Sequence, residues 1–271
     1  MNNNPIGVFD SGLGGLTAVK QLDDILPYEN IIYFGDTSRL PYGTRGTDTI
    51  KKYARQDVAF LESFGVKVIL AACGTVSSVA LDDLNTAFGE PIFGVVESAA
   101  RTAVRLSKNG KIGIIGTEAT IRSGSYEKKI KALDSSINVK SVSCPLFVPL
   151  VENGHIDDKN EITTLAARLY LKDIMDFGAD TIVLGCTHYP IISNIISDVV
   201  GSEIQLIDPG RQAAIELKTL LEQKNMLCDK KEIGTREFYV SDSVEAFKAL
   251  GSIFLGKQIT SKVEKIDIER Y

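Results

Sequence analysis

The chain has 271 residues, of which 44% are hydrophobic and 24% are charged, and its formal net charge is −5. This composition is typical of a globular protein with one large or two modest domains. Lys and Arg form no basic stripe, so we do not expect nucleic acid as the main partner. No apolar run approaches the ~18 residues that cross a bilayer, and the N-terminus lacks the basic and apolar segments of a signal peptide. We therefore expect a cytoplasmic protein with no membrane partner.

Strands and helices are expected to alternate in the first part of the chain. Short apolar runs predict strands, and apolar positions at helical spacing predict helices. The predicted strands are 6–9, 30–34, 66–72 and 91–96, and the predicted helices are 16–26, 47–65, 75–87 and 97–107. This alternation indicates a parallel sheet that is covered by helices on both faces.

The pattern restarts at residue 111, where a strand resembles the one at 6–9. Further strands are predicted at 138–142, 181–184 and 237–242, and residues 206–210 are expected to close the second half. Thr120, Ser123 and Tyr126 lead into one predicted helix, further helices are predicted near 158–177 and 211–225, and a final helix and tail follow. We therefore predict an α/β fold of two similar parallel-sheet domains that are related by a pseudo-two-fold, with the active site in the cleft between them. The first domain is predicted to comprise residues 1–97 plus 211–271, and the second residues 98–210.

A glycine-rich turn at residues 10–15 follows the first predicted strand and raises the possibility of a nucleotide site. The dinucleotide fingerprint requires a third glycine where Thr17 stands, and no phosphate-loop lysine follows. Backbone amides at the start of the next helix can still hold an anion such as a carboxylate. Simple capping of that helix by Asp10 or Ser11 is the alternative interpretation.

Two cysteines occur in matching contexts, one in each half of the chain. Cys73 and Cys186 each follow an apolar strand, and each is followed closely by a threonine. Ligands of open α/β sheets bind beyond the carboxyl ends of the strands. If the halves face each other, a thiol approaches each side of a bound molecule, and a helix N-terminus behind each thiol is expected to lower its pKa. This arrangement suits an enzyme that exchanges protons on two faces.

Other interpretations of these cysteines are weaker. A cysteine in a strand is commonly a buried hydrophobe, and four cysteines in a cytosolic chain do not indicate a disulfide framework. Cys186 and His188 offer two metal ligands where three or four are usual. A Cys186 nucleophile with a His188 base is also conceivable, although a continued strand would point the two side chains apart and Cys73 would stay unexplained. Cys144 and Cys228 are assigned to structure.

Five motifs occur in order along most of the chain, from residue 6 to about 208. They are DSGLGG at 10–15, PYG at 41–43, AACGT at 71–75, GVVE at 94–97 and LGCTHYP at 184–190. Each motif is weak by itself, but the ordered set resembles the glutamate racemases, a cofactor-independent family of the aspartate/glutamate racemase superfamily.

The resemblance implies a mechanism in which one thiolate removes the α-proton of glutamate and the other thiol returns a proton to the opposite face. Cys73 and Cys186 would exchange these roles with the handedness of the substrate. Asp10 would assist Cys73, whereas Glu152 and His188 would assist Cys186. The implied substrate-binding residues are Asp10, Ser11, Pro41, Tyr42, Gly43, Gly74, Thr75, Thr187 and His188.

The resemblance also implies the setting of the reaction. It implies no metal and no cofactor, two α/β domains with a C-terminal segment that returns to the first, and a homodimer. The D-glutamate product would supply peptidoglycan synthesis.

Position 74 departs from the family pattern, because Gly74 stands where asparagine is usual. The missing side chain would remove a hydrogen bond worth about 0.5–1.5 kcal/mol and enlarge the pocket. Ser98, where proline is more usual, is a lesser departure. Two alternatives stay open at this point: a racemase for another amino acid such as aspartate, and a weakly active homologue with a binding or regulatory role.

Overall fold

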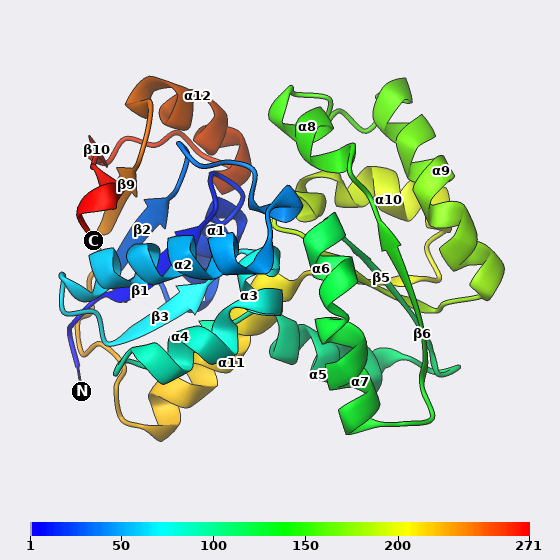
Figure 1. Cartoon of the computed structure of the whole chain (residues 1–271), viewed down its shortest axis with the longest axis horizontal. Helices are drawn as coiled ribbons and strands as arrows, with labels where there is room; N and C mark the ends of the chain where they lie inside the picture. The colour runs from blue at the N-terminus through cyan, green and yellow to red at the C-terminus, as the bar shows by residue number, and fades with distance from the viewer. Residues whose placement is uncertain (1) are drawn as a thin grey trace.

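The computed structural model describes residues 2–271, which form two lobes that lie side by side (Figure 1). The first lobe contains a six-stranded sheet in the order β10-β9-β2-β1-β3-β4, and the second lobe contains a four-stranded sheet in the order β6-β5-β7-β8. Every strand pairing in both sheets is parallel. The predicted class, two parallel-sheet α/β domains, is confirmed.

The first lobe is built from the two ends of the chain. Its strands are β1 (Ile6–Asp10), β2 (Ile31–Gly35), β3 (Val68–Ala71), β4 (Ile92–Gly94), β9 (Arg236–Val240) and β10 (Val263–Lys265). Its helices are α1 (Leu16–Ile25), η1 (Tyr42–Thr44), α2 (Thr47–Glu62), α3 (Gly74–Val79), α4 (Leu81–Ala87), α12 (Val244–Leu255) and η3 (Ile268–Arg270), where η marks a 3₁₀ helix.

The second lobe is built from the middle of the chain. Its strands are β5 (Lys111–Gly116), β6 (Asn138–Ser143), β7 (Thr181–Gly185) and β8 (Gln205–Ile207). The helices around it are α5 (Val96–Leu106), α6 (Glu118–Ser123), α7 (Ser125–Leu133), α8 (Phe147–Glu152), α9 (Glu161–Phe177), η2 (Tyr189–Ile192) and α10 (Ser193–Val200).

The two sheets repeat one strand order, β2-β1-β3-β4 in the first lobe and β6-β5-β7-β8 in the second. In the first sheet the chain runs from β1 to its neighbour β2 and then crosses to β3 on the opposite side of β1. In the second sheet it runs from β5 to β6 and then crosses to β7 on the opposite side of β5. The resulting switch points lie between β1 and β3 and between β5 and β7. Ligands of open α/β sheets bind beyond the carboxyl ends of the strands at such points. Topology alone therefore locates two half-sites.

Burial explains why the central strands could be predicted. All five residues of β1 and all five of β7 are buried, since helices cover both faces of each sheet. Such strands are continuous apolar runs. The edge strand β6, with the sequence NVKSVS, is only partly buried and accordingly carries polar residues.

Several elements differ from the prediction. The expected single helices after Cys73 and Thr120 are each two short helices, and the second pair is divided at Gly124, whose φ of 63° favours glycine. The short α8, which contains Pro149, and the tail strand β10 were not predicted. Both are too brief for a hydrophobic period to be visible.

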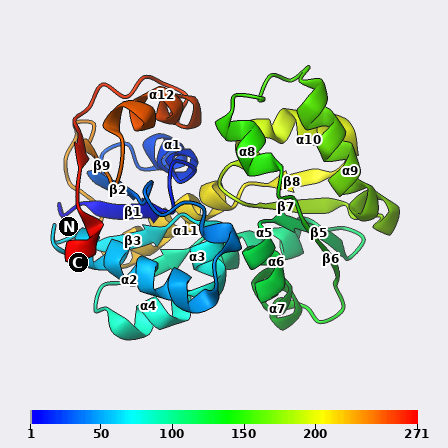
Figure 2. The same ribbon diagram turned by 45° about the horizontal axis from the view of Figure 1, so that its top comes forward.

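The helix α11 (Pro209–Gln223) lies between the lobes, because it packs against both α1 and α5 (Figure 2). The chain then returns to the first sheet through β9 and β10. The exact domain boundaries near residues 97 and 210 stay a prediction.

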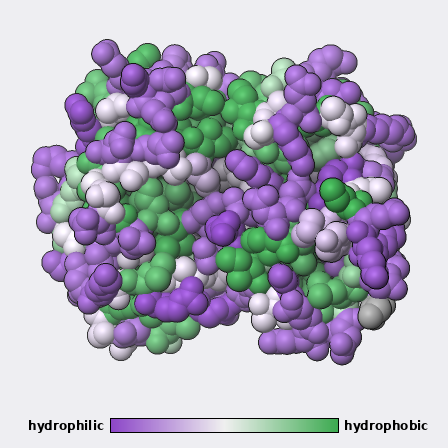
Figure 3. Space-filling model, turned by 180° about the vertical axis from the view of Figure 1, so that it is seen from behind, coloured by the Kyte–Doolittle hydropathy of each residue, from purple (hydrophilic) through white to green (hydrophobic). Residues whose placement is uncertain are grey.

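The surface carries hydrophobic patches in both lobes, separated by hydrophilic side chains (Figure 3). Within residues 2–271, no helix combines the length and apolar character that crossing a membrane requires.

Candidate active site

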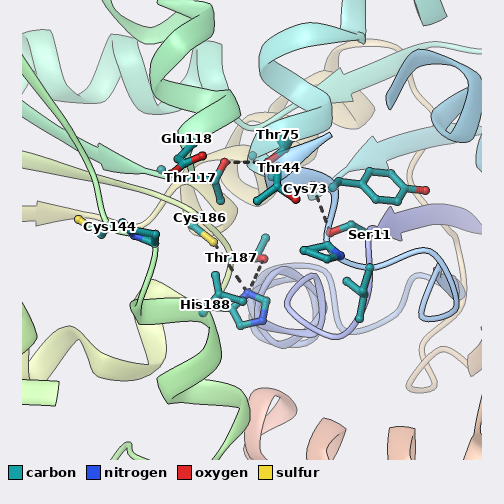
Figure 4. Close-up of a pocket in the computed structure, with 18 of the residues that line it drawn as sticks. Ser11, Thr44, Cys73, Thr75, Thr117, Glu118, Cys144, Cys186, Thr187 and His188 are labelled. Atoms are coloured by element: carbon teal, nitrogen blue, oxygen red, sulfur yellow. Dashed lines mark hydrogen bonds between the residues drawn. The ribbon is translucent and has the colours of Figure 1, made fainter. Parts of the chain in front are cut away.

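A cavity of about 350 Å³ lies between the lobes, within the size range of small-molecule sites. Residues at both switch points line it, and Figure 4 shows Cys73 and Cys186 entering from the ribbons of different lobes. The predicted residues that line it are Ser11, Pro41, Tyr42, Gly43, Cys73, Gly74, Thr75, Glu152, Cys186, Thr187 and His188. The chain therefore brings together eleven of the twelve residues singled out from the sequence, and Asp10 alone lies outside the lining.

Cys73 caps the start of α3, directly beyond the carboxyl end of β3. Its sulfur lies 3.6 Å from the hydroxyl oxygen of Ser11, which follows β1. Burial, together with the nearby carboxyl of Asp10, raises the pKa of the Cys73 thiol to about 12. The backbone N–H of Val76 in α3 does lower this pKa, but desolvation outweighs it, so the expectation of a lowered pKa at Cys73 is wrong.

Asp10 ends β1 and is fully buried behind the cavity. One carboxyl oxygen accepts a hydrogen bond from the backbone N–H of Gly12 at 2.9 Å, and the other has no partner among the described residues. Burial raises the pKa of Asp10, although the positive charge of His188 and the Gly12 N–H oppose the rise. Its assistance to Cys73 stays a prediction.

Cys186 lies immediately after β7, where the chain turns into η2. Its sulfur lies 3.8 Å from Nδ1 of His188, and Nε2 of His188 lies 2.9 Å from Oε1 of Glu152 at the end of α8. The expectation that Cys186 and His188 point apart is wrong, because the strand ends at Gly185 and the turn brings the two side chains together.

His188 is a buried cation at neutral pH. Burial by itself would lower its pKa, but the hydrogen bonds with Cys186 and Glu152 raise the pKa to about 10. The ring of Phe254 packs edge-on against the imidazole, with the centroids 5.1 Å apart. This second cysteine therefore has a cation beside its sulfur, as is common at reactive thiols.

Sequence reasoning missed Thr117, which lines the cavity just beyond β5. Its hydroxyl lies 3.0 Å from that of Thr75 and so links the two lobes across the cavity (Figure 4). The internal repeat could have pointed to Thr117. This residue directly follows β5, the strand that corresponds to β1, just as Ser11 directly follows β1. Further unpredicted lining residues are Leu40, Thr44, Glu118, Cys144, Pro145, Val148, Pro149 and Gly185.

The other two cysteines lie in different surroundings. Cys144 is fully buried beside the cavity, where desolvation raises its pKa. Cys228 is partly exposed, and its backbone N–H donates to Glu29 at 2.8 Å, far from the cavity in the first lobe. A structural role for both stays a prediction.

Gly74 does not open additional space in the cavity. A Cβ atom at this position would lie 2.5 Å from the backbone carbonyl oxygen of Gly185, across the boundary between the lobes. The expected enlargement of the pocket is therefore wrong, since the opposing backbone occupies that space. Gly14 is similarly close to Thr187 and His188. Glycine at these positions permits close approach of the lobes.

The cavity combines two thiols on opposing lobes with neutral hydrogen-bond donors. Of the described residues that line it, none is Lys or Arg, and hydroxyls come from Ser11, Thr44, Thr75, Thr117 and Thr187. Such a site can hold the carboxylates of a small molecule through hydroxyl and backbone N–H groups. It can also exchange a proton at each face of that molecule.

Comparisons with known proteins agree with this chemistry. The family model described as Asp/Glu/Hydantoin racemase matches residues 16–217. Glutamate racemase of Geobacter metallireducens is 41% identical over 254 residues, which cover 94% of this chain and 93% of the relative. Glutamate racemase of Chlorobaculum tepidum is 44% identical over 259 residues, which cover 95% of this chain and 94% of the relative. The crystal structure of Francisella tularensis glutamate racemase in complex with D-glutamate has a TM-score of 0.93 and 39% identity, with each chain covered fully. The chain belongs to the Asp/Glu/Hydantoin racemase family, among its glutamate racemases.

Proposed function

We propose that this protein is a cofactor-independent glutamate racemase that interconverts L- and D-glutamate by proton transfer at the α-carbon. The observation that carries the proposal is the pair of cysteines at equivalent switch points of two sheets, on opposing lobes around one cavity. A single base would suffice for removing a proton, whereas inversion needs a base on one face and an acid on the other.

In the reaction the α-carbon loses one proton to one cysteine and gains one proton from the other. The thiolate of one cysteine takes the α-proton and becomes a thiol, which leaves a carbanion that the adjacent carboxylate delocalises. The thiol of the other cysteine gives its proton to the opposite face and becomes a thiolate. Reversal of handedness exchanges the roles of Cys73 and Cys186, and the two states of the enzyme differ only in which sulfur holds the proton.

The neighbours of each sulfur support these roles. His188, charged at neutral pH and anchored by Glu152, stabilises negative charge on Cys186. Cys73 is a thiol at neutral pH, because burial and Asp10 raise its pKa to about 12. The ammonium group of a bound amino acid brings a positive charge into the cavity, which favours the thiolate that the reverse reaction needs.

Glutamate fits the polarity of the cavity. Its two carboxylates can accept hydrogen bonds from hydroxyl side chains that line the cavity on both lobes, and the Francisella tularensis relative is known in complex with D-glutamate. Neutral donors hold the substrate while leaving the proton-transfer groups as the main charges. The aspartate alternative has no specific observation in its favour.

We also propose a cytoplasmic homodimer whose D-glutamate supplies peptidoglycan synthesis. The outer face of α9 supports self-association, because Ile162, Leu165 and Leu169 follow helical spacing and are 58%, 68% and 70% exposed. An exposed apolar stripe of this kind commonly marks a protein interface.

The proposal is tested by incubating the metal-free and cofactor-free protein with L-glutamate in D₂O. We expect the optical rotation to decay to zero as α-deuterium is incorporated, and D-glutamate to give the same final mixture. Aspartate serves as the comparison substrate. Turnover of aspartate without glutamate would contradict the proposed substrate, and no turnover of any amino acid would contradict the enzyme.

Replacing Gly74 by alanine is expected to lower kcat/KM for glutamate. The added Cβ meets the carbonyl of Gly185, and overpacking of this kind costs about 1–3 kcal/mol, or roughly 5- to 150-fold in kcat/KM if it opposes approach of the lobes. Gly89→Ala is the matched control, since a Cβ at Gly89 has no atom within 4 Å. Steady-state kinetics of both variants make the comparison, and equal kcat/KM values would contradict it.

A further inference from the structure

A buried ionic cluster lies behind the part of the cavity wall formed by residues 41–43. We name it the Arg39 cluster, and it comprises Asp36, Arg39, Tyr42 and Asp57. Both carboxylates are fully buried, and the side chain of Arg39 is 9% exposed. The guanidinium donates two hydrogen bonds, one from Nε to Asp36 at 2.5 Å and one from Nη2 to Asp57 at 3.0 Å. Removing Arg39 would leave two buried carboxyl groups without their counter-charge.

Tyr42 belongs to both the cluster and the cavity. Its side chain is almost fully buried, and its hydroxyl donates a hydrogen bond to Asp36 and lies 3.2 Å from Oδ2 of Asp57. The same residue lines the cavity and begins η1. The phenol therefore anchors this segment of the wall to the charged groups behind it.

The cluster connects segments that are distant in sequence. Ser241, after β9, donates to Asp36 at 2.8 Å and accepts from the backbone N–H of Ser38 at 2.9 Å. Gln56 of α2 accepts from Arg39 at 2.5 Å, and Glu269 in η3 lies 3.4 Å from the same nitrogen. The end of β2, α2, the end of β9 and the C-terminal turn thus converge on the Arg39 cluster, and the end of β9 reaches it through Asp36.

Stability alone is a poor explanation for this arrangement. Two buried carboxylates face one guanidinium, and burial together with Asp36 raises the pKa of Asp57 well above its usual range. Buried ion pairs are often no more stabilising than the apolar residues that could replace them. Their directional contacts do, however, fix the position of a loop.

We propose that Arg39 is a positioning residue for substrate binding, because it holds Asp36 and Asp57 and thereby fixes Tyr42 and the cavity wall at residues 41–43. This inference rests on the proposed racemase function. A wall that is already in its binding position spares the substrate the cost of ordering it. The thiols lie on other segments, so the effect falls on substrate affinity more than on proton transfer.

Tyr42→Phe and Arg39→Lys test the proposal in the full-length protein. The first removes the hydroxyl between the carboxylates, and the second keeps the charge but cannot reproduce the forked contacts. We expect KM for glutamate to rise about tenfold in each, with kcat within about twofold of the parent. A merely structural defect would lower the unfolding temperature and kcat while leaving KM unchanged.

Tyr53→Phe is the matched control. The Tyr53 ring packs against Tyr42 with centroids 5.4 Å apart and lies 4.2 Å from the Arg39 guanidinium, but its hydroxyl makes no hydrogen bond to residues 2–271. We expect its KM to match that of the parent. If the parent racemises glutamate and all three variants share its KM, the positioning role is overturned. If the parent racemises no amino acid, the proposed function fails instead.

Discussion

Replacement of Cys73 or Cys186 by serine is expected to abolish racemisation while one enantiomer still exchanges its α-proton. Serine is far too weak an acid to form the anion at this position, so proton transfer at one face falls by about 10²–10⁴-fold. The remaining cysteine still removes the proton that faces it and returns a deuteron from D₂O to the same face. Cys73→Ser and Cys186→Ser should therefore exchange opposite enantiomers.

The two enantiomers give this experiment an internal check. They have equal free energies, so any active variant must have equal kcat/KM values in the two directions. Exchange of the α-proton without inversion does not interconvert the enantiomers, so its rate can differ between L- and D-glutamate. The measurement follows α-deuterium by NMR alongside optical rotation, starting from each pure enantiomer.

Cys228→Ser is the control, because this partly exposed cysteine lies far from the cavity. It should racemise as the parent does. Exchange of the same enantiomer by both Cys73→Ser and Cys186→Ser would refute the assignment of one face of the substrate to each cysteine. Racemisation at the parent rate by either variant would refute the two-thiol mechanism.

The sequence was sufficient to predict most of the fold and the two cysteine positions. Strands such as β1 and β7 are buried on both faces and are therefore continuous apolar runs. The repeated strand, cysteine and threonine pattern then identified Cys73 and Cys186 as equivalent ends. The two cysteines follow strands of different sheets, so the expectation that they meet in one site rested on the two halves facing each other.

The sequence could not show how side chains meet around the sulfurs. The contact between His188 and Cys186 depends on where β7 stops, and the contact between His188 and Glu152 depends on the short α8. Likewise, the raised pKa of Cys73 comes from burial by surrounding segments that a local motif does not contain. Tertiary structure decides such properties, and local pattern does not.

Glu152→Gln is expected to shift the pH dependence of the enzyme through His188. The hydrogen bond from His188 to the Glu152 carboxylate helps to raise the imidazole pKa to about 10, so its charge persists well above neutral pH. Without the carboxylate this pKa moves towards its ordinary value of about 6.5. We expect kcat to fall about 10²-fold and its decline on the alkaline side to begin at lower pH.

The raised pKa of His188 also makes the stability of the fold depend on pH. Because the folded-state pKa of His188 lies above the unfolded value, the charged form stabilises the fold fully below about pH 6.5, and this contribution is lost as the pH rises through about 10. In Glu152→Gln the loss should be complete at a lower pH. Thermal unfolding between pH 6 and pH 10 therefore separates the parent from the variant.

NMR titration of His188 makes the cause directly visible, since the chain has only two histidines and a His155→Gln background leaves one signal. Glu203→Gln is the control, because it removes an exposed carboxylate from the same lobe, away from the cavity. We expect the His188 titration to move only in Glu152→Gln. If it stayed in place while kcat fell, Glu152 would act directly on the substrate, and the proposed chain from Glu152 through His188 to Cys186 would be wrong.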